Sequence, residues 1–564
     1  MNNGFDNNEN LNSVNPENAA PEAAETAPET VETAEAAPEQ PKKRKKFLVP
    51  VIICAVVVLL AAIVIGAIAI YNAFFKKDDV QNLFNENLLC VRDGDQWGYV
   101  NKNGKYVIKA KYDKAYNFTE NGIARIAQFD EDELAYNYGY INKKGDAIVK
   151  AKYKDARDFS ECGLAAVMNE DGEWGAIDKN GEVVINLKYA GIQIYDSGVI
   201  IVRSSKDKMF LVDKKGEEIS EKYDSISWYE DAEIGVVYDD DECGIINAKG
   251  KEVMELTDDF DSLGGFNEDG IGRYREDDYY GIINAKGKII TKADYEYLSS
   301  FNENGLAIFG EDDEYGILNA RGKEVVKAGE YADFERINDG WFLAIDEEGE
   351  VITVLNEKCK EVFSYEEDGD WYMANDFADN GLAPIMDDDD LYGFINRKGK
   401  VVIDCKYESA SSFSSCGLAR VREEDDEEFR FINAKGNVVG GSYLYATSYF
   451  DDGYAVAVEV DGGEIIIKII NDKGRLVKEL ECDDVLLPSG VGVLSSAADY
   501  VVNSEDFDHE EFLINYIEEN YDEDDFGMGI DSAEEYVEQM LEYMGSDAIN
   551  QMVYNILRGA EGIY

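Results

Sequence analysis

The stretch that decides the fold is Trp97-Gly98-Tyr99-Val100-Asn101-Lys102-Asn103-Gly104-Lys105. It contains an aromatic-Gly pair, two apolar residues, and an Asn followed three residues later by Gly. An Asn side chain caps a type I turn, and the following Gly takes the left-handed conformation of a bulge. Apolar residues alternate on both sides of such turns, as with Tyr280, Ile282 and Ile289 in a later copy. The stretch therefore predicts a β-hairpin with one buried face.

The same pattern recurs from about Leu88 to Val502. Its second glycine, or the Cys359 that replaces one, falls at 104, 145, 181, 216, 250, 287, 322, 359, 399, 436 and 474, a mean period of 37 residues. A second half-pattern in each unit, such as Phe118 with Gly122-Ile123-Ala124, indicates about four short strands per unit. One such unit buries too little apolar surface to fold alone, so neighbours must stack and share a core.

These repeats predict a mainly β fold, a tandem array of about eleven β-hairpin repeats over residues 88–503. Two arrangements of the array are open. A propeller-like closure would need two rings, because eleven units exceed the usual number of about four to eight blades. An open superhelical stack is the alternative.

The strings from Trp97 to Lys105 and from Trp174 to Gly181, with their Gly-Leu-Ala partners, resemble bacterial WG-containing repeats. The resemblance covers about 415 of the 564 residues. It implies a binding or scaffold module of bacterial envelope and secreted proteins, with no assigned ligand or catalytic residue. Most copies here replace the Trp by Tyr or Cys, so we expect a core-packing role for Trp97 and Trp174. We expect the adjacent Gly to admit a closely approaching neighbour.

The N-terminal region predicts a membrane anchor. Residues 1–46 form an acidic tail, expected to be disordered, that ends in Lys42-Lys43-Arg44-Lys45-Lys46. Residues 47–75 are uncharged and long enough to cross a hydrocarbon core of about 30 Å as a transmembrane helix. The basic cluster places the N-terminus in the cytoplasm and the repeats outside the cell. Cleavage after a signal peptide is the alternative, because Ala67-Ile68-Ala69 has a suitable pattern, but the apolar run is too long for one.

Charge and residue usage exclude several classes of protein. The chain has 54 basic and 118 acidic residues, a formal net charge of −64, so it would repel nucleic acid. Its single histidine, His509, leaves no Ser/His/Asp or Cys/His relay in the repeats. The cysteines form no Cys-x-x-Cys pair. We therefore expect no enzyme and no cofactor.

Clusters of acidic residues precede most aromatic-Gly pairs and predict the second hairpin turn of each unit. Carboxylates on flexible loops are the ligands that Ca²⁺ prefers, so weak Ca²⁺ binding is one hypothesis. A solvated surface that keeps the array soluble is the favoured alternative. The candidate metal ligands are Asp239, Asp240, Asp241 and Glu242 in one turn, and Asp387, Asp388, Asp389 and Asp390 in another.

From Ser504 the periodicity becomes helical, which predicts a small acidic α-helical cap over residues 504–564. The whole sequence favours a single-pass cell-membrane protein that acts as a non-catalytic binding or scaffold module at the bacterial cell surface. The expected partners are the membrane and a cell-wall polysaccharide or protein. A Ca²⁺-dependent adhesin or polysaccharide-binding protein is the first alternative. A glycosidase-type enzyme is the second, because paired carboxylates are abundant.

Overall fold

The computed structural model describes residues 81–337, 340–366, 369, 371–423, 426, 428–461, 464–504, 507–520, 532–544 and 546–557. The predicted tail (1–46) and transmembrane segment (47–75) lie outside these residues. In the ranges described, no helix is both long enough and apolar enough to span a membrane. Every element named below belongs to one unit of the chain, which starts at Asp79.

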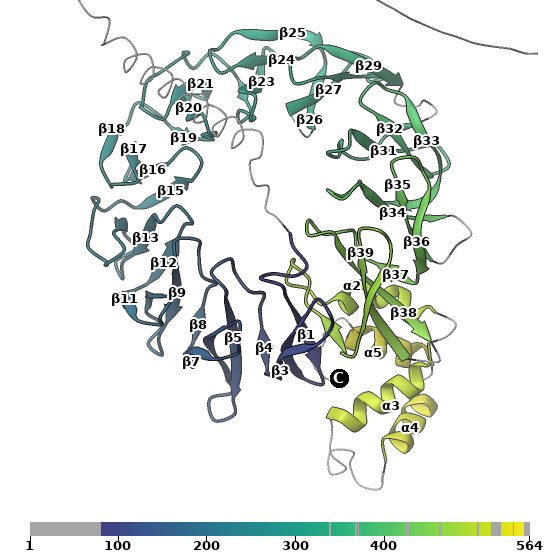
Figure 1. Ribbon diagram of the computed structural model, residues 1–564. Coiled ribbons are helices and arrows are strands. Elements are labelled where there is room, and N and C mark those ends of the chain that lie inside the picture. Colours follow the sequence, from purple (N-terminus) through teal and green to yellow (C-terminus); the bar gives the residue numbers. More distant parts are fainter. Residues whose placement is uncertain are drawn as a thin grey trace, which may run out of the picture. The chain divides into compact units, whose positions relative to one another are not determined.

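The strands of this unit pair antiparallel in ten small sheets that follow one another along the chain (Figure 1). The first half contains β1 (Leu88–Asp93), β2 (Gln96–Asn101) and β3 (Tyr106–Tyr112); β4 (Lys114–Ala115), β5 (Ile123–Asp130), β6 (Ala135–Asn142) and β7 (Ala147–Tyr153); β8 (Asp155–Ala156), β9 (Leu164–Met168), β10 (Trp174–Asp178) and β11 (Val183–Tyr189); β12 (Gly191–Ile194), β13 (Ile200–Arg203) and β14 (Met209–Val212); and β15 (Ser225–Tyr229), β16 (Ile234–Asp239), β17 (Glu242–Asn247) and β18 (Glu252–Thr257).

The second half continues the same order. It contains β19 (Ser262–Gly264), β20 (Ile271–Glu276) and β21 (Tyr279–Asn284); β22 (Tyr297–Leu298), β23 (Leu306–Glu311), β24 (Glu314–Asn319) and β25 (Glu324–Tyr331); β26 (Asp333–Ile337), β27 (Trp341–Ile345), β28 (Val351–Leu355) and β29 (Glu361–Glu366); β30 (Tyr372–Met373), β31 (Leu382–Met386), β32 (Tyr392–Asn396), β33 (Val401–Ala410), β34 (Leu418–Glu423), β35 (Phe429–Asn433) and β36 (Val438–Tyr443); β37 (Tyr445–Ala446), β38 (Tyr454–Asp461), β39 (Glu464–Asn471) and β40 (Leu476–Leu480); and β41 (Asp484–Val485). Because the long strand β33 joins two units into one sheet, the ten sheets hold the eleven predicted repeats.

All eleven predicted hairpin turns form, with one geometry. In the first, Asn101 Oδ1 accepts hydrogen bonds from the N–H groups of Asn103 and Lys105 at 2.9 and 3.2 Å. Gly104 has a φ of +69°, and even Cys359, which replaces a glycine, has a φ of +53°. The turn chemistry read from the sequence is confirmed. The other ten caps are Asn142, Asp178, Asp213, Asn247, Asn284, Asn319, Asn356, Asn396, Asn433 and Asn471.

The glycine of the aromatic-Gly pair makes room for backbone, as predicted. A Cβ on Gly98 would lie 2.5 Å from the Ala110 nitrogen and 2.7 Å from the Ile108 oxygen of β3. The expected core role of the preceding aromatic is right only in part. Trp97 packs against a core cluster but is partly exposed, whereas Tyr99 is fully buried. The Tyr99 hydroxyl donates a hydrogen bond to the Tyr116 carbonyl at 2.7 Å, so it is the second aromatic that fills the core.

Consecutive sheets share core clusters. Leu88 and Tyr99 of the first sheet pack with Ile126 and Ile141 of the second. Arginines add polar links between successive sheets, since Arg125 Nη1 donates to the Ala156 carbonyl at 2.7 Å. The predicted sharing of one core between neighbours is therefore confirmed for these sheets.

The first sheet is completed from the far end of the repeats. β41 pairs antiparallel with β1, with Val485 opposite Val91 and Asp484 opposite Arg92. The Leu486 N–H donates to the Cys90 carbonyl at 3.0 Å, one residue beyond β41. β41 is the edge strand next to β1 in the first sheet. The short strands β4, β8 and β37 occupy the equivalent edge of their own sheets. We call this pairing the closing contact.

Among the residues that the structure describes, four helices follow: α2 (Val493–Val502), α3 (His509–Asn520), α4 (Ala533–Met544) and α5 (Ser546–Leu557). α3, α4 and α5 lie in the predicted helical region. α2 does not, so the predicted boundary between residues 503 and 504 is too late. Leu494, Ala498 and Val501 of α2 are buried in the same cluster as β38 and β41, which makes the helix part of the core of the last sheet.

Candidate binding site

The first acidic turn is a two-residue hairpin turn between β16 and β17. Asp239 lies opposite Glu242 at the strand ends, and Asp240 has a φ of +51°. Lys208 Nζ bridges Asp224 at 2.7 Å and Asp239 at 2.5 Å. The hydrogen bond to Asp224, and to a smaller extent the one to Asp239, raises the pKa of Lys208 above its usual value. One of the four predicted metal ligands is therefore engaged by a lysine.

The second acidic turn connects β31 and β32. Asp387 Oδ1 accepts hydrogen bonds from the N–H groups of Asp389 and Leu391 at 3.2 and 2.9 Å. Asp390 takes a left-handed φ of +60°. The Asp387 carboxylate thus caps its own turn, as an Asn or Asp side chain does in the other turn of each unit.

The structure does not bring the predicted ligands of the two turns together. In the part of the chain that it describes, no three Asp, Glu, His or Cys side chains are grouped so that they could hold a metal ion. The Ca²⁺ hypothesis stays a prediction.

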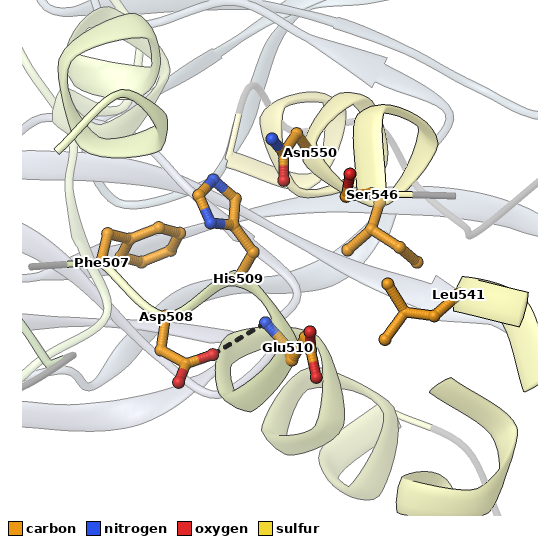
Figure 2. Close-up of a pocket in the computed structure, with 8 residues that line it drawn as sticks. Phe507, Asp508, His509, Glu510, Leu541, Ser546 and Asn550 are labelled. Carbon is orange, nitrogen blue, oxygen red and sulfur yellow. Dashed lines mark hydrogen bonds between the residues drawn. The ribbon is translucent and has the colours of Figure 1, made fainter. Parts of the chain in front are cut away.

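His509, the only histidine, lines a shallow depression of about 470 Å³ between the C-terminal helices, with Ser546 and Asn550 of α5 on its other side (Figure 2). Its Nε2 lies 2.9 Å from the Val502 carbonyl oxygen. Asp508 Oδ1 accepts hydrogen bonds from the N–H groups of Glu510 and Glu511, both at 3.0 Å, and so caps α3. His509 thus contacts the last carbonyl of α2, and Asp508 caps the first turn of α3. This arrangement does not resemble a relay for nucleophilic catalysis.

A second depression, of about 430 Å³, lies beside the closing contact. Its lining comes from four parts of the chain: the start of the unit, the loop before β34 with part of that strand, the segment from β37 to β38, and the turn after β41. We call it the seam pocket. It is lined by Gln81, Ser414, Ser415, Arg420, Tyr445, Thr447, Ser448, Tyr449, Phe450, Asp451, Leu487 and Ser489.

The seam pocket differs chemically from the rest of this acidic chain. Seven of its twelve lining residues carry a hydroxyl group, and Arg420 and Asp451 are its only charged residues. Asp451 is engaged, since its Oδ2 accepts a hydrogen bond from the Gln81 N–H at 2.8 Å. The lining is therefore neutral, in a protein whose formal net charge is −64.

Arg420 is held at this site by its surroundings. Its Nη1 donates to the Ala446 carbonyl at 2.5 Å, and its guanidinium lies 4.8 Å from the Phe429 ring and 5.8 Å from the Tyr445 ring. Its buried Nε has no hydrogen-bond partner among the residues that the structure describes. Such contacts fix the orientation of the guanidinium.

At least three of the seven lining hydroxyls are bonded within the protein: besides Tyr449, Ser414 Oγ donates to the Leu418 carbonyl at 2.9 Å and Thr447 Oγ1 accepts from the Val456 N–H at 3.0 Å. Tyr449 donates to the Asn471 carbonyl at 2.8 Å, and burial raises the pKa of its phenol, so it stays neutral. Ser415, Ser448 and Ser489 are exposed, and their hydroxyls bond to no group in the described part of the chain. These three serines can donate to and accept from a ligand.

Sequence reasoning missed the seam pocket, although one signal points to it. In most of the units that the structure describes, a four-residue turn precedes the strand that corresponds to Gly-Leu-Ala, closed here by the Gly417 N–H and the Ser414 carbonyl at 2.8 Å. In most units the second residue of this turn is acidic, whereas here it is Ser415. The acidic residues at this position are Glu120, Glu161, Asp196, Asp231, Glu268, Glu303, Asp379 and Asp451.

The sheets and turns define a β-repeat protein. Five segments match the model of the WG containing repeat, namely residues 97–128, 138–172, 174–206, 280–315 and 392–425. Each begins at the aromatic residue of the aromatic-Gly pair. The chain thus carries WG-type repeats, as the sequence pattern indicates.

Two further comparisons add little. No curated protein matches the chain. Among solved structures, that of a eukaryotic initiation factor has 10% identity and a TM-score of 0.32, covering 70% of this chain and 95% of its own. The dihydro-heme d1 dehydrogenase NirN has 12% identity and a TM-score of 0.24, covering 70% and 73%. Hsv2 of Kluyveromyces lactis has 11% identity and a TM-score of 0.21, covering 44% and 89%.

Proposed function

We propose that this chain is a non-catalytic binding or scaffold module at the surface of a bacterial cell. In this proposal a single helix over residues 47–75 anchors it, residues 1–46 lie in the cytoplasm, and the repeats lie outside. The observation that carries the binding role is the seam pocket, which has a hydroxyl-rich lining with one arginine and one aspartate, and in which Ser415 replaces the acid that most units have at this turn position. Concave sites with a few well-placed polar groups are typical ligand sites.

We further propose that the repeats are arranged like the blades of one propeller, in place of the two rings that closure of so many repeats led us to expect. The support is the closing contact, because β41 supplies the first sheet with the strand that it would otherwise lack. A closed series leaves no terminal repeat with an uncovered core face and only short strand edges, which suits a module exposed outside the cell.

The engaged carboxylates favour this reading over a Ca²⁺-dependent adhesin. Asp387 caps its own turn and Asp239 pairs with Lys208, so a cation would have to compete with existing contacts. Glycosidase chemistry needs two carboxyl groups facing a common substrate. Neither acidic turn contributes a residue to the two depressions described above.

Protease treatment of intact cells tests the placement of the repeats. We expect an added protease to remove an epitope placed after Tyr564 and to leave one placed before residue 1 protected. In cells opened by detergent both epitopes should be lost. A C-terminal epitope that survives in intact cells while an N-terminal one is lost would reverse the proposed orientation, and survival of both would place the chain inside the cell.

A further inference from the structure

The seam pocket has features that narrow the chemical class of its ligand. We propose that it binds a neutral saccharide, held by hydroxyl groups and by the aromatic rings of Tyr445 and Phe450 beside the closing contact. This inference rests on the proposed binding function and names the ligand class that the function would serve.

Charge is the first step. The lining contains two charged residues, Arg420 and Asp451. The Asp451 carboxylate already accepts a hydrogen bond from the Gln81 N–H. Around this neutral lining lies a chain with a formal net charge of −64. The resulting field repels anionic ligands such as uronic acid polymers or teichoic acids. A cationic ligand would find stronger sites at the acidic turns, so a neutral ligand fits the pocket best.

Hydrogen-bonding capacity is the second step. Ser415, Ser448 and Ser489 present exposed hydroxyls that can each donate one hydrogen bond and accept two. A sugar ring carries several hydroxyls with the same capacity, so donors and acceptors can be matched in several orientations. An ordinary apolar ligand would leave these groups without partners, at a cost in free energy.

Shape and ring faces are the third step. Tyr445 and Phe450 add half-buried aromatic surface to the lining. Tyr445 is supported by Tyr500 of α2, with ring centroids 5.4 Å apart, and by the Arg420 guanidinium. A ring fixed in this way offers apolar surface to the C–H face of a sugar at little entropic cost. The volume of about 430 Å³ suits a short saccharide or the end of a longer chain.

The other repeats suggest a substitution for testing the pocket, because they show which residue the fold accepts at the position of Ser415. Ser415→Glu restores the acid that stands at this turn position in Glu120, Glu161 and Glu303, so the fold has already accepted it elsewhere. A second variant, Ser448→Glu, changes another exposed lining residue. Its matched control is Ser300→Glu, because Ser300 is exposed, stands at the same place in its own unit and lies outside the pocket lining.

The test uses the full-length protein in detergent micelles and affinity electrophoresis through gels that contain one polysaccharide each. The neutral probes are dextran, amylose, laminarin and mannan, and the anionic probes are alginate and hyaluronan. We expect at least one neutral polysaccharide to retard the wild-type protein, and neither anionic one to do so. Ser415→Glu and Ser448→Glu should weaken that retardation at least tenfold, and Ser300→Glu should leave it unchanged.

Three outcomes would overturn the inference: no retardation by any neutral polysaccharide, equal retardation by the anionic ones, or binding that survives both pocket variants. Circular dichroism of each variant separates lost binding from lost folding. The protease experiment is independent of these gels. Exposed repeats that bind no neutral saccharide would leave the surface module standing and remove only its ligand.

Discussion

At the residue scale, the most demanding position is the glycine of the aromatic-Gly pair. Replacing Gly98 by Ala would force a methyl group against the backbone at Ala110, which lies 2.5 Å from the ideal Cβ position. Overpacking typically costs about 1 to 3 kcal/mol, and backbone yields less readily than side chains, so we expect a loss of about 3 kcal/mol in the free energy of unfolding. Thermal or urea unfolding followed by circular dichroism measures it.

The matched control is Gly191→Ala. The three atoms nearest to its new methyl group would all belong to the Arg203 side chain, at 3.6 Å or more, and its φ lies outside the left-handed region. We expect a change within about 0.5 kcal/mol, the range of surface substitutions. Equal losses for the two variants would show that the glycine of the pair is not required by close backbone approach.

At Cys359 we expect glycine to stabilise the protein, because Cys359 stands at a turn position where most units have glycine. Its φ of +53° is strained for a residue with a Cβ, and Cys359→Gly should raise the free energy of unfolding by about 1 kcal/mol. Cys359→Ala keeps the Cβ and the strain, so its stability should not rise. Urea unfolding of both variants compares them, and a gain with Ala as large as that with Gly would point to loss of the thiol as the cause.

Asp484 provides a pH-dependent prediction. Burial in the closing strand raises the pKa of its carboxyl above the usual value, although the N–H groups of Leu494 and Val485 donate to it. The folded state then holds the proton more tightly than the unfolded state. The stabilisation from this proton is complete below the unfolded-state pKa and is lost as pH rises through the folded-state pKa.

Asp484→Asn should remove this pH dependence. Relative to wild type, its melting temperature should improve as pH rises through the folded-state pKa of Asp484. Asp499→Asn, at an exposed position of α2, removes one charge without a buried site and is the control. Melting curves at a series of pH values and constant ionic strength measure both. Parallel profiles for wild type and Asp484→Asn would contradict the assignment.

At the element scale, the acidic hairpin turns are destabilised by backbone strain as well as by repulsion between their carboxylates. Asp312 and Asp313 connect β23 to β24 with φ values of +53° and +64°, and the flanking Glu311 and Glu314 lie opposite each other. Two positive φ values are the geometry of a type I′ turn, which favours Asn-Gly. Replacing the pair by Asn-Gly should stabilise the protein by about 1 kcal/mol.

Asn-Asn at the same two positions is the control for this turn. It removes the same charges but retains a Cβ at the second position, so we expect a smaller gain. Calorimetric melting at low and high salt separates the two contributions, because screening weakens repulsion and leaves backbone strain unchanged. Equal gains for both variants would mean that charge alone limits this turn.

The sequence predicts local structure here far better than long-range structure. Asn101 and Gly104 fix a turn through contacts within five residues, so their pattern identifies the hairpin in all eleven copies. The closing contact pairs Arg92 with Asp484 across the whole repeat region, and no local pattern in the two-residue strand β41 indicates it. α2 was missed for the same reason, because its apolar face is explained only by the sheet it covers.

The candidate site follows the same rule. The acidic turns are conspicuous in the sequence, yet the structure engages Asp387 in its own turn and Asp239 with Lys208. The seam pocket brings together residues from four distant segments, and its sign in the sequence is one serine, Ser415, in a position where most units have an acid. Comparison of the repeats position by position could have found that serine, but not the residues that surround it.

At the scale of the whole molecule, the closing contact should couple the two ends of the repeat region. Leu486→Pro removes the N–H that donates to the Cys90 carbonyl, and it should lower the free energy of unfolding by about 3 kcal/mol. Hydrogen exchange should then rise together in β1, in β41 and in α2, because α2 packs against the same cluster. The amides of β23 and β24, in the middle of the array, should keep their protection.

Glu347→Pro is the control for the proline itself. Glu347 is exposed and is the second residue of a turn that the Gly349 N–H closes on the Asp346 carbonyl at 3.1 Å, a place where proline is favoured. Its exchange pattern should match that of the wild type. If Leu486→Pro loosened α2 but left the β1 amides as protected as before, β1 would not depend on the strand that comes from the other end, and the propeller-like arrangement would lose its support.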